Sequence, residues 1–351
     1  MTRPVVYVYT ATLAPRDAVS GQAVAHARIL DAMGFEAILV ADGVHEFFDS
    51  PVIDVEVALT ANRAAGWLIH FGVWSDGLEA IVSEGTGPRV LVHHNTTPPE
   101  LLPEGPVREV CQQAVDRLPE IAEGWACIIG DSAHNLAVLH AAGFSGGRVI
   151  PPLVMHGANT TSSVRTHEVM MVGRMAPSKG LEYAVKAIAL VDRLRPDLKA
   201  ELHLIGSSAG WDAYAQGVQR LAGLAVAPVA TRGSLSDADR DALYGRAGLL
   251  LVTSRHEGFC VPLVEAMRAG TPIVATDVGA VGETLGGAGI LLPPGDPELI
   301  AEAVIRVLDD HALADTLSRQ GLIRANDFDP DRVESQLRDA FDEAFAPLGR
   351  A

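Results

Sequence analysis

Residues 257–265 read Glu-Gly-Phe-Cys-Val-Pro-Leu-Val-Glu, with a carboxylate at each end. A Gly-aromatic turn follows Glu257, and the run Val261–Ala269 has the apolar spacing of a helix that carries Pro262 in its first turn. The apolar run Leu249–Val252 precedes the turn and has the length of a buried strand. Strand, turn and helix in this order form the repeating unit of a parallel α/β sheet.

The same alternation extends along the whole chain. In the first half it predicts strands at Val5–Tyr9, Ala37–Ala41, Trp67–Phe71, Arg89–His93, Ala126–Gly130 and Arg148–Ile150. The predicted helices there are Gln22–Met33, Asp54–Ala65, Val107–Arg117 and Ser132–Ala142. In the second half the predicted strands are Val169–Val172, Glu201–Ile205, Val229–Arg232, Leu249–Val252, Pro272–Ala275 and Gly289–Leu292. The predicted helices there are Leu181–Leu194, Trp211–Ala222, Ser236–Gly245, Val261–Ala269, Pro297–Leu308 and Asp331–Phe345.

The alternation breaks once, at Pro151-Pro152 and the polar stretch Gly157–Thr166. A chain of 351 residues suits two domains. We therefore predict an α/β protein with two doubly wound Rossmann-like domains that face a central cleft, where the carboxyl ends of the strands bind ligand. The expected divisions are an N-terminal domain over 1–152, a linker over 153–167, a C-terminal domain over 168–328, and a helical segment over 329–351 that packs back toward the N-terminal domain.

The amino-acid composition limits the classes of partner that the protein is expected to bind. The formal net charge of −17 and a pI near 5.0 argue against nucleic acid and against an anionic membrane surface. The three cysteines show no metal-ligand spacing, and no signal peptide or membrane-length apolar run is apparent. We expect a reduced, cytoplasmic protein that holds any anionic ligand with a few local cations.

Two of those cations, Arg174 and Lys179, stand in residues 173–180, which read Gly-Arg-Met-Ala-Pro-Ser-Lys-Gly after an apolar run. A strand-to-helix turn directs backbone amides and the positive end of a helix toward one point, which suits phosphate. Arginine adds a planar fork for phosphate oxygens, and lysine adds a compact charge. An isolated Arg-x4-Lys would more simply be a solvated turn, but the acidic stretch downstream favours the ligand.

The carboxylates of Glu257 and Glu265 lie about two helical turns apart, so they can contact different parts of one extended ligand. Each carboxylate can accept two hydroxyl protons. The amides of residues 258–260 open the helix and can face phosphate. The alternative is a helix-capping acid at Glu257 and a solvated helix face at Glu265.

Residues 173–180 and 257–265 resemble the donor-binding motifs of retaining GT-B glycosyltransferases of family 4, also called group 1. The resemblance continues in the segments Gly233–Asp237, Leu243-Tyr244, Ser254–Glu265, Ala266-Met267, Ala269–Pro272 and Gly289–Leu292. It implies a transferase of the EC 2.4 class that moves a sugar from a nucleotide diphosphate sugar to an acceptor hydroxyl. It also implies that Glu257 contacts the sugar and Glu265 the ribose, and that Arg174, Lys179, Glu257 and His94 are the catalytic residues.

The resemblance assigns further residues to the donor nucleotide: Gly21, Gly173, Gly206, Ser207, Arg232, Gly233, Gly258, Phe259, Cys260 and Val261. No Asp-x-Asp motif stands at the position where a metal-dependent sugar transferase keeps one. We therefore expect no cofactor and no essential metal, with the cationic pair stabilising the departing diphosphate.

The first half resembles the branch of this family that carries a His-Asn-x-Thr-Pro motif, here His94 to Pro98. The implied acceptor-side residues are Asp17, Ser20, His70 and Asn95. Residues 17–21 read as a small, flexible loop that brings amides to the diphosphate, or as an ordinary connection. His94 can bind a phosphate or a sugar oxygen. Gly21 and His93 depart from the branch pattern, which leaves the acceptor open.

Three alternatives remain at this stage. The protein is another GT-B enzyme (a phosphorylase, hydrolase, epimerase or pseudo-glycosyltransferase), a glycolipid-forming enzyme at a membrane surface, or a binder of nucleotide sugars without catalysis. The first half contains no lysine and no evident basic amphipathic helix, which favours a soluble acceptor. The nucleotide base, the sugar, the linkage and the oligomeric state do not follow from the sequence.

Overall fold

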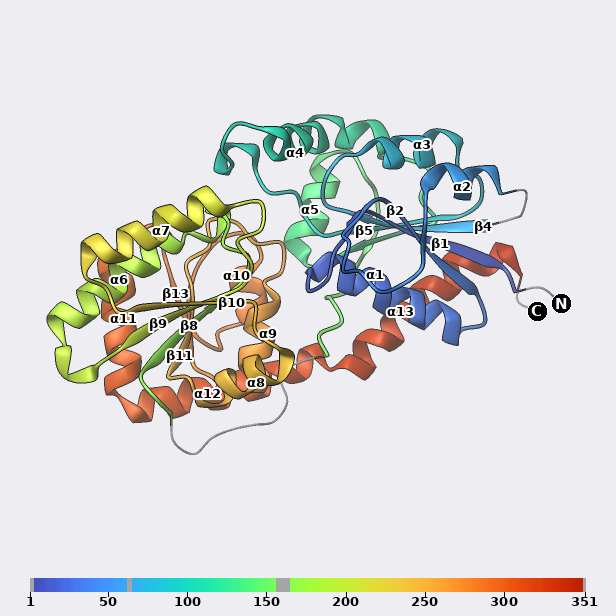
Figure 1. Cartoon of the computed structure of the whole chain (residues 1–351). Coiled ribbons are helices and arrows are strands. Elements are labelled where there is room, and N and C mark those ends of the chain that lie inside the picture. The colour runs from blue at the N-terminus through green and yellow to red at the C-terminus, as the bar shows by residue number, and fades with distance from the viewer. Residues whose placement is uncertain (1–2, 62–64, 156–164, 350–351) are drawn as a thin grey trace. The chain divides into compact units, whose positions relative to one another are not determined.

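The computed structural model describes residues 3–61, 65–155 and 165–349. The chain divides into two compact units (Figure 1). Unit 1 comprises residues 1–153 and 330–351, and unit 2 comprises residues 154–329. Most of the predicted linker, residues 156–164, lies outside the described residues.

Unit 1 is built on a seven-stranded sheet whose strands pair in parallel, in the order β3-β2-β1-β4-β5-β6-β7. The strands are β1 (Val5–Leu13), β2 (Glu36–Val44), β3 (Val52–Ile53), β4 (Ala65–Phe71), β5 (Arg89–His93), β6 (Cys127–Gly130) and β7 (Arg148–Val149). The helices are α1 (Ala18–Ala32), α2 (Val55–Thr60), α3 (Asp76–Glu84), α4 (Pro106–Arg117), α5 (Ala133–Ala141) and the chain-terminal α13 (Pro330–Phe345).

Helix α13 joins α1 on one face of this sheet, and α2 to α5 cover the other (Figure 1). Its buried positions Val333, Leu337, Phe341 and Phe345 recur every four residues, which makes one apolar stripe. That stripe packs in the same core as the apolar side chains of α1 and β1. The last helix of the chain therefore stabilises the unit formed by the first half.

Unit 2 has a six-stranded parallel sheet in the order β10-β9-β8-β11-β12-β13. The strands are β8 (Glu168–Val172), β9 (Glu201–Ile205), β10 (Val229–Gly233), β11 (Leu249–Val252), β12 (Ile273–Thr276) and β13 (Ile290–Leu292). The helices are α6 (Leu181–Leu194), α7 (Asp212–Ala225), α8 (Asp237–Arg246), α9 (Val261–Arg268), α10 (Val281–Leu285), α11 (Pro297–Asp309) and α12 (His311–Ala325). One face packs against α6, α7 and α11, and the other against α8, α9 and α10.

The predicted fold class, two doubly wound Rossmann-like domains, is confirmed. In each sheet the strand order reverses at one point, between β1 and β4 in unit 1 and between β8 and β11 in unit 2. Ligands of such sheets bind beyond the carboxyl ends of the strands at this reversal, the switch point. These two places are therefore where candidate site residues have to be sought.

Several predicted elements were wrong or missing. The helix predicted over Asp54–Ala65 ends at Thr60, and Ala65 already begins β4. Strand β3 and helices α3, α10 and α12 were not predicted. Helix α12 buries Leu317, Gly321 and Ala325, and two of these three are small. A small side chain carries little hydrophobic signal, so the apolar spacing of α12 is weak.

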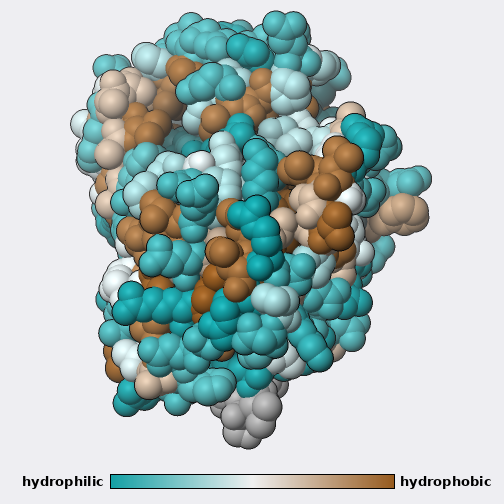
Figure 2. Space-filling model, turned by 90° about the vertical axis from the view of Figure 1, so that its left-hand side faces the viewer, coloured by the Kyte–Doolittle hydropathy of each residue, from teal (hydrophilic) through white to brown (hydrophobic). Residues whose placement is uncertain are grey.

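The length and apolarity of a helix decide whether it could cross a membrane. None of the helices within the described ranges is both long and apolar enough to cross a bilayer. Figure 2 shows hydrophobic patches separated by hydrophilic residues on the face that it draws.

Candidate functional site

The switch point of unit 2 gathers the two motifs that the sequence analysis selected. The turn of residues 173–180 follows β8, and the loop of residues 253–260 follows β11, the neighbouring strand. Thr253 ties the two together, since its hydroxyl donates to the carbonyls of Lys179 and Gly180 at 3.2 and 3.0 Å. Gly180 has a φ of +61°, and an added Cβ would overlap with the carbonyl oxygen of Thr253. A glycine is therefore required where the turn enters α6.

Main-chain hydrogen bonds hold the neighbouring loops in register. Gly173 N donates to Ile205 O at 2.9 Å, and Met175 N donates to Ser207 O at 2.9 Å. Gly206 N donates to Gly233 O at 2.8 Å. Gly206 lies so close to Gly173 that a Cβ would overlap with its carbonyl oxygen. The loops after β8, β9 and β10, with the loop after β11 that Thr253 joins to them, thus form one continuous rim. Four residues predicted to bind the sugar donor, Gly173, Gly206, Ser207 and Gly233, lie in its first three loops.

The central contact of this rim is an ion pair. Lys179 Nζ lies 2.7 Å from Glu257 Oε1, and Ser254 Oγ donates to the same oxygen at 2.6 Å. The Glu257 side chain is 9% exposed and that of Lys179 is 23% exposed. The sequence suggested separate roles for these two residues, on the sugar and on the phosphate. The structure pairs them, so an anionic ligand would have to share Lys179 with Glu257.

Arg174 differs from Lys179. Its side chain is exposed, and among the described residues its guanidinium makes no hydrogen bond or ion pair. A void of about 10 Å³ lies under the turn and is lined by both cations. Another hollow of unit 2, of about 590 Å³, is lined mainly by α7 and β10, and neither cation lines it.

A segment outside the predicted site fixes the backbone of Glu257. Ala280 N donates to Glu257 O at 2.9 Å. Gly279 adopts a φ of +55°, and a Cβ there would overlap with that same carbonyl oxygen. Thr284 Oγ1 donates to Phe259 O at 2.8 Å, and Cys260 opens α9 with a φ of +73°. The start of α9 is therefore held by the loop between β12 and α10 and by α10 itself, and Gly279 and Gly282 were the available signal in the sequence.

Glu265 is buried, so the alternative of a solvated helix face is excluded. The Tyr244 hydroxyl donates to Oε2 at 2.9 Å, and Arg240 Nη2 lies 3.3 Å from Oε1. Both partners belong to α8, four residues apart and hence on one face of that helix. Burial, and next the charge of Glu265, raises the pKa of Tyr244 well above its usual value, so the hydroxyl stays a donor. The sequence analysis had not assigned Tyr244 or Arg240 to the site.

Arg232 is exposed, and its Nε donates to His203 Nδ1 at 3.3 Å. His203 lies in β9 beside Glu168 and Glu201, which begin their strands. The arginine therefore lies against the sheet rather than in the rim.

In unit 1, the interpretation of residues 17–21 as a flexible loop was wrong. Asp17 caps α1, because its Oδ2 accepts from Ser20 N at 3.0 Å and from Ser20 Oγ at 2.9 Å. Gly21 N donates to Asp17 O at 2.9 Å as part of the first helical turn. These polar groups already bond one another, so the amide of Gly21 is engaged in the helix rather than presented to a phosphate.

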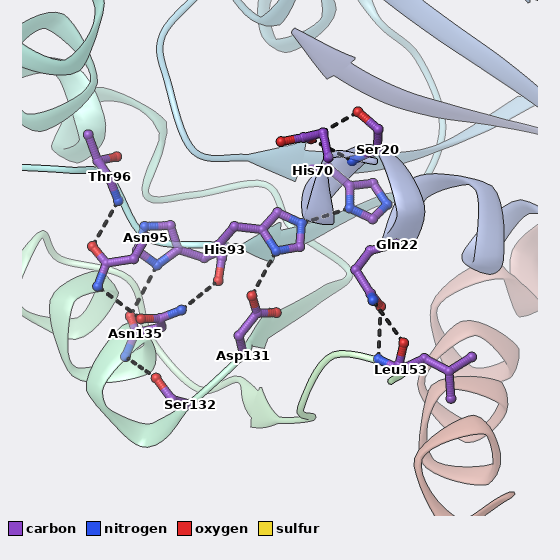
Figure 3. Close-up of polar contacts among 12 residues, drawn as sticks. Ser20, Gln22, His70, His93, Asn95, Thr96, Asp131, Ser132, Asn135 and Leu153 are labelled. Carbon is purple, nitrogen blue, oxygen red and sulfur yellow. Dashed lines mark hydrogen bonds and ion pairs between the residues drawn. The ribbon is translucent and has the colours of Figure 1, made fainter. Parts of the chain in front are cut away.

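The other predicted residues of unit 1, His70, His94 and Asn95, lie at the carboxyl ends of β4 and β5, beside the end of β6 (Figure 3). His94 Nδ1 lies 2.7 Å from Asp131 Oδ2, and His94 Nε2 lies 2.8 Å from His70 Nδ1. The His70 and His94 rings are stacked, with centroids 5.1 Å apart. Both nitrogens of His94 thus have partners. Asp131 was not predicted, and no local pattern marks it.

Asn95 holds the backbone beside this cluster in place. It has a φ of +68°, its Nδ2 donates to Asn135 Oδ1 at 2.9 Å, and its Oδ1 accepts from Thr96 N at 2.8 Å. Asn135 in turn donates from Nδ2 to His93 O at 3.1 Å. Asn95 therefore fixes the loop after β5 to the start of α5 (Figure 3).

Burial lowers the pKa values of two histidines behind His94, His70 and His26. It lowers the pKa of His70 well below the usual value, and the charges of His26 and His94 act in the same direction. Burial, and next the charge of His94, lowers the pKa of His26 to about 3. Both imidazoles are therefore neutral at neutral pH.

Comparison with known proteins supports the resemblance in unit 2. Residues 166–310 match the family model described as glycosyl transferases group 1. The chain is 32% identical over 194 residues to a D-inositol 3-phosphate glycosyltransferase of Salinispora arenicola. The aligned stretch covers 53% of this chain and 43% of that protein. It is 28% identical over 177 residues to O-antigen chain mannosyltransferase B of Escherichia coli. That alignment covers 49% of this chain and 45% of that protein. The chain thus spans less than half the length of these curated relatives.

Solved structures agree on the fold of the whole chain. Sucrose-phosphate synthase from Thermosynechococcus elongatus matches with a TM-score of 0.77 at 20% identity, over 98% of this chain and 100% of that one. Anabaena Alr3699/HepE, solved with UDP and glucose, matches with a TM-score of 0.78 at 18% identity, over 97% and 100% of the two chains. Two Rossmann-like α/β domains of the GT-B type are therefore shown.

Proposed function

We propose that the protein is a glycosyltransferase that moves a sugar from a nucleotide diphosphate sugar to an acceptor hydroxyl with retention of configuration. The observation that carries the proposal is the Lys179–Glu257 pair at the switch point of unit 2, inside the segment that matches group 1 glycosyltransferases. The names of the relatives, and the UDP and glucose bound by Alr3699/HepE, support a nucleotide-sugar donor.

Unit 2 offers partners for each part of such a donor. Lys179 and Arg174 supply positive charge for the diphosphate, together with the amides at the start of α9. Glu257 accepts hydroxyls of the transferred sugar through the oxygen that Lys179 and Ser254 leave available. Glu265 accepts ribose hydroxyls, and Tyr244 and Arg240 orient its carboxylate.

The reaction follows from these roles. The bond from C1 of the sugar to the diphosphate oxygen breaks, and Lys179 and Arg174 stabilise the negative charge that develops on that oxygen. The acceptor hydroxyl attacks C1 from the face that the diphosphate leaves, which retains the configuration. The departing phosphate oxygen takes the hydroxyl proton. We propose that the two cations make a metal ion unnecessary.

The acceptor side belongs to unit 1, with His94 as its reactive group. We propose a soluble acceptor and a cytoplasmic location, because unit 1 has no lysine for an anionic surface and the three cysteines are free. Membership of family 4, and of its His-Asn-x-Thr-Pro branch, is part of the same proposal.

The test is turnover of UDP-, GDP-, ADP- and dTDP-sugars by the intact chain and by Lys179→Ala and Arg174→Ala. The matched control is Lys186→Ala, an exposed lysine of α6 outside the site. We expect Lys179→Ala to lower kcat/KM by about 10²- to 10³-fold, the usual effect of removing one group that stabilises developing negative charge. Activity near that of the unmodified protein in both site variants would overturn the assignment.

A further inference from the structure

In unit 1, Asp131, His94 and His70 form a chain of hydrogen bonds that all donate in one direction. Asp131, His94 and His70 are linked end to end by contacts of 2.7 and 2.8 Å (Figure 3). The side chains of His94 and Asp131 are 7% and 8% exposed, and His70 is buried. Such a chain of short contacts, largely shielded from water, holds each ring in one orientation.

The backbone places Asp131 for this contact. Strands β5 and β6 pair in parallel up to His93 and Gly130, and Asp131 N donates to His93 O at 3.4 Å. The pairing thus continues one residue beyond the strands. It brings the first residue after β6 beside the first residue after β5. The carboxylate of Asp131 therefore meets His94 from a fixed backbone.

The carboxylate decides which nitrogen of His94 carries hydrogen. A carboxylate accepts hydrogen bonds and does not donate them, so His94 Nδ1 must be the N–H. In the neutral ring, Nε2 then holds the lone pair, and His70 must donate to it from Nδ1. This leaves His70 Nε2 as a lone pair. Among the described residues, that atom indeed has no hydrogen-bond partner, and neither has His26 Nδ1 behind it.

We propose that Asp131 and His70 are positioning residues that hold His94 with its hydrogen on Nδ1 and its lone pair on Nε2, so that His94 receives a ligand hydroxyl and not a phosphate oxygen. This inference rests on the proposed function. Nε2 has one lone pair, so a ligand hydroxyl that donates to it replaces His70, which occupies that lone pair in the unliganded protein. A phosphate oxygen carries no hydrogen to donate, so it does not fit that atom.

The test combines a spectroscopic and a kinetic measurement on the intact protein. ¹⁵N-labelled histidine shifts report which ring nitrogen of His94 is protonated, and a His94→Asn spectrum assigns the signal. We expect protonation at Nδ1 alone at neutral pH. A His94 ring protonated at Nε2 would overturn the proposal, whatever the catalytic activity. This arm therefore fails separately from the proposed function.

The kinetic arm uses Asp131→Asn, with Ser132→Ala as the matched control. Ser132 caps α5 next to Asp131 but is not one of the three linked residues, so its loss tests the effect of weakening the turn alone. We expect Asp131→Asn to lower kcat by about 10- to 100-fold, because the ring of His94 loses the partner that fixes its orientation. The Kd of UDP should stay within about twofold in both variants.

Two results would contradict the assignment to hydroxyl binding. One is an Asp131→Asn variant that binds UDP more weakly while kcat is unchanged. The other is an equal loss of kcat in Ser132→Ala, which would show that the turn matters only structurally. If Asp131→Asn does not fold, the ¹⁵N measurement on the unmodified protein still decides the direction of the chain.

Discussion

Unit 1 and unit 2 have the same reversal of strand order in their sheets, and both gather polar residues beyond the carboxyl ends of the strands beside it. The chemistry differs. Unit 2 pairs a lysine with a buried carboxylate, Lys179 with Glu257, and the lysine side chain is partly accessible. In unit 1 the Asp131 carboxylate contacts the ring of His94, which in turn contacts the buried ring of His70. One topology thus supports a lysine–carboxylate pair in one unit and a carboxylate–imidazole chain in the other.

The glycines show a second difference. In unit 2, Gly206 and Gly279 lie against carbonyl oxygens that leave no room for a Cβ. In unit 1, Gly21 lies in the first turn of α1, and a Cβ there would have no neighbour within 4 Å. The rim of unit 2 therefore depends on close backbone approach, whereas this part of unit 1 does not.

The largest expected effect tests this contrast. Gly279→Ala should destabilise unit 2 by roughly 3 kcal/mol or more, because it combines an unfavourable backbone conformation with overlap on the carbonyl oxygen of Glu257. Hydrogen exchange followed by mass spectrometry would report β11 and β12 separately from the strands of unit 1. Faster exchange should be confined to unit 2.

Gly21→Ala is the matched control in unit 1. Its backbone angle suits alanine, so α1 should gain about 0.5 to 1 kcal/mol. Equal effects of the two substitutions would remove the distinction between the units.

A smaller expected effect is a loss of stability of unit 1 at acidic pH. His26 has a pKa of about 3 in the folded unit and near 6.5 when exposed, so the unfolded chain binds more protons below pH 6.5. Unit 1 should therefore lose stability as pH falls from about 6.5, by about 2 kcal/mol at pH 5. His70 acts in the same direction.

Tryptophan fluorescence can isolate this loss. Trp67, Trp74 and Trp125 belong to unit 1, and Trp211 is the one tryptophan of unit 2. Urea unfolding of a Trp211→Phe protein at pH 7.5 and pH 5 would follow unit 1 alone. A His26→Phe variant should lose part of the pH dependence, and the part due to His70 should remain. An unchanged pH dependence in that variant would show that His26 is not its source.

Much of the fold follows from local sequence. The bounds of β5, β9, β11 and α6 agree with those predicted, because short apolar runs and long amphipathic segments carry strong periodic signals. The signal fails for α12, whose buried face includes Gly321 and Ala325. It also fails at Asp17, where a helix cap resembles a loop residue in sequence.

Sequence spacing placed several candidate residues at one edge of a sheet but did not specify their contacts. Spacing placed Lys179 and Glu257 in turns that face one edge of a sheet, yet they pair across 78 positions of sequence. Asp131 meets His94 across 37 positions only because β5 and β6 are neighbours. Such contacts depend on strand order, and no local pattern specifies it.

The central claim is that the rim of unit 2 binds a nucleotide diphosphate through Lys179. Calorimetry with UDP, GDP, ADP and dTDP, with and without Mg²⁺, tests it on the unmodified protein and on Lys179→Ala. We predict that one nucleotide binds equally well with and without Mg²⁺ and that the substitution weakens its binding about tenfold or more, as expected for a lost charge-assisted contact. If none of the four binds, or if Lys179→Ala binds as tightly as the unmodified protein, the claim is contradicted.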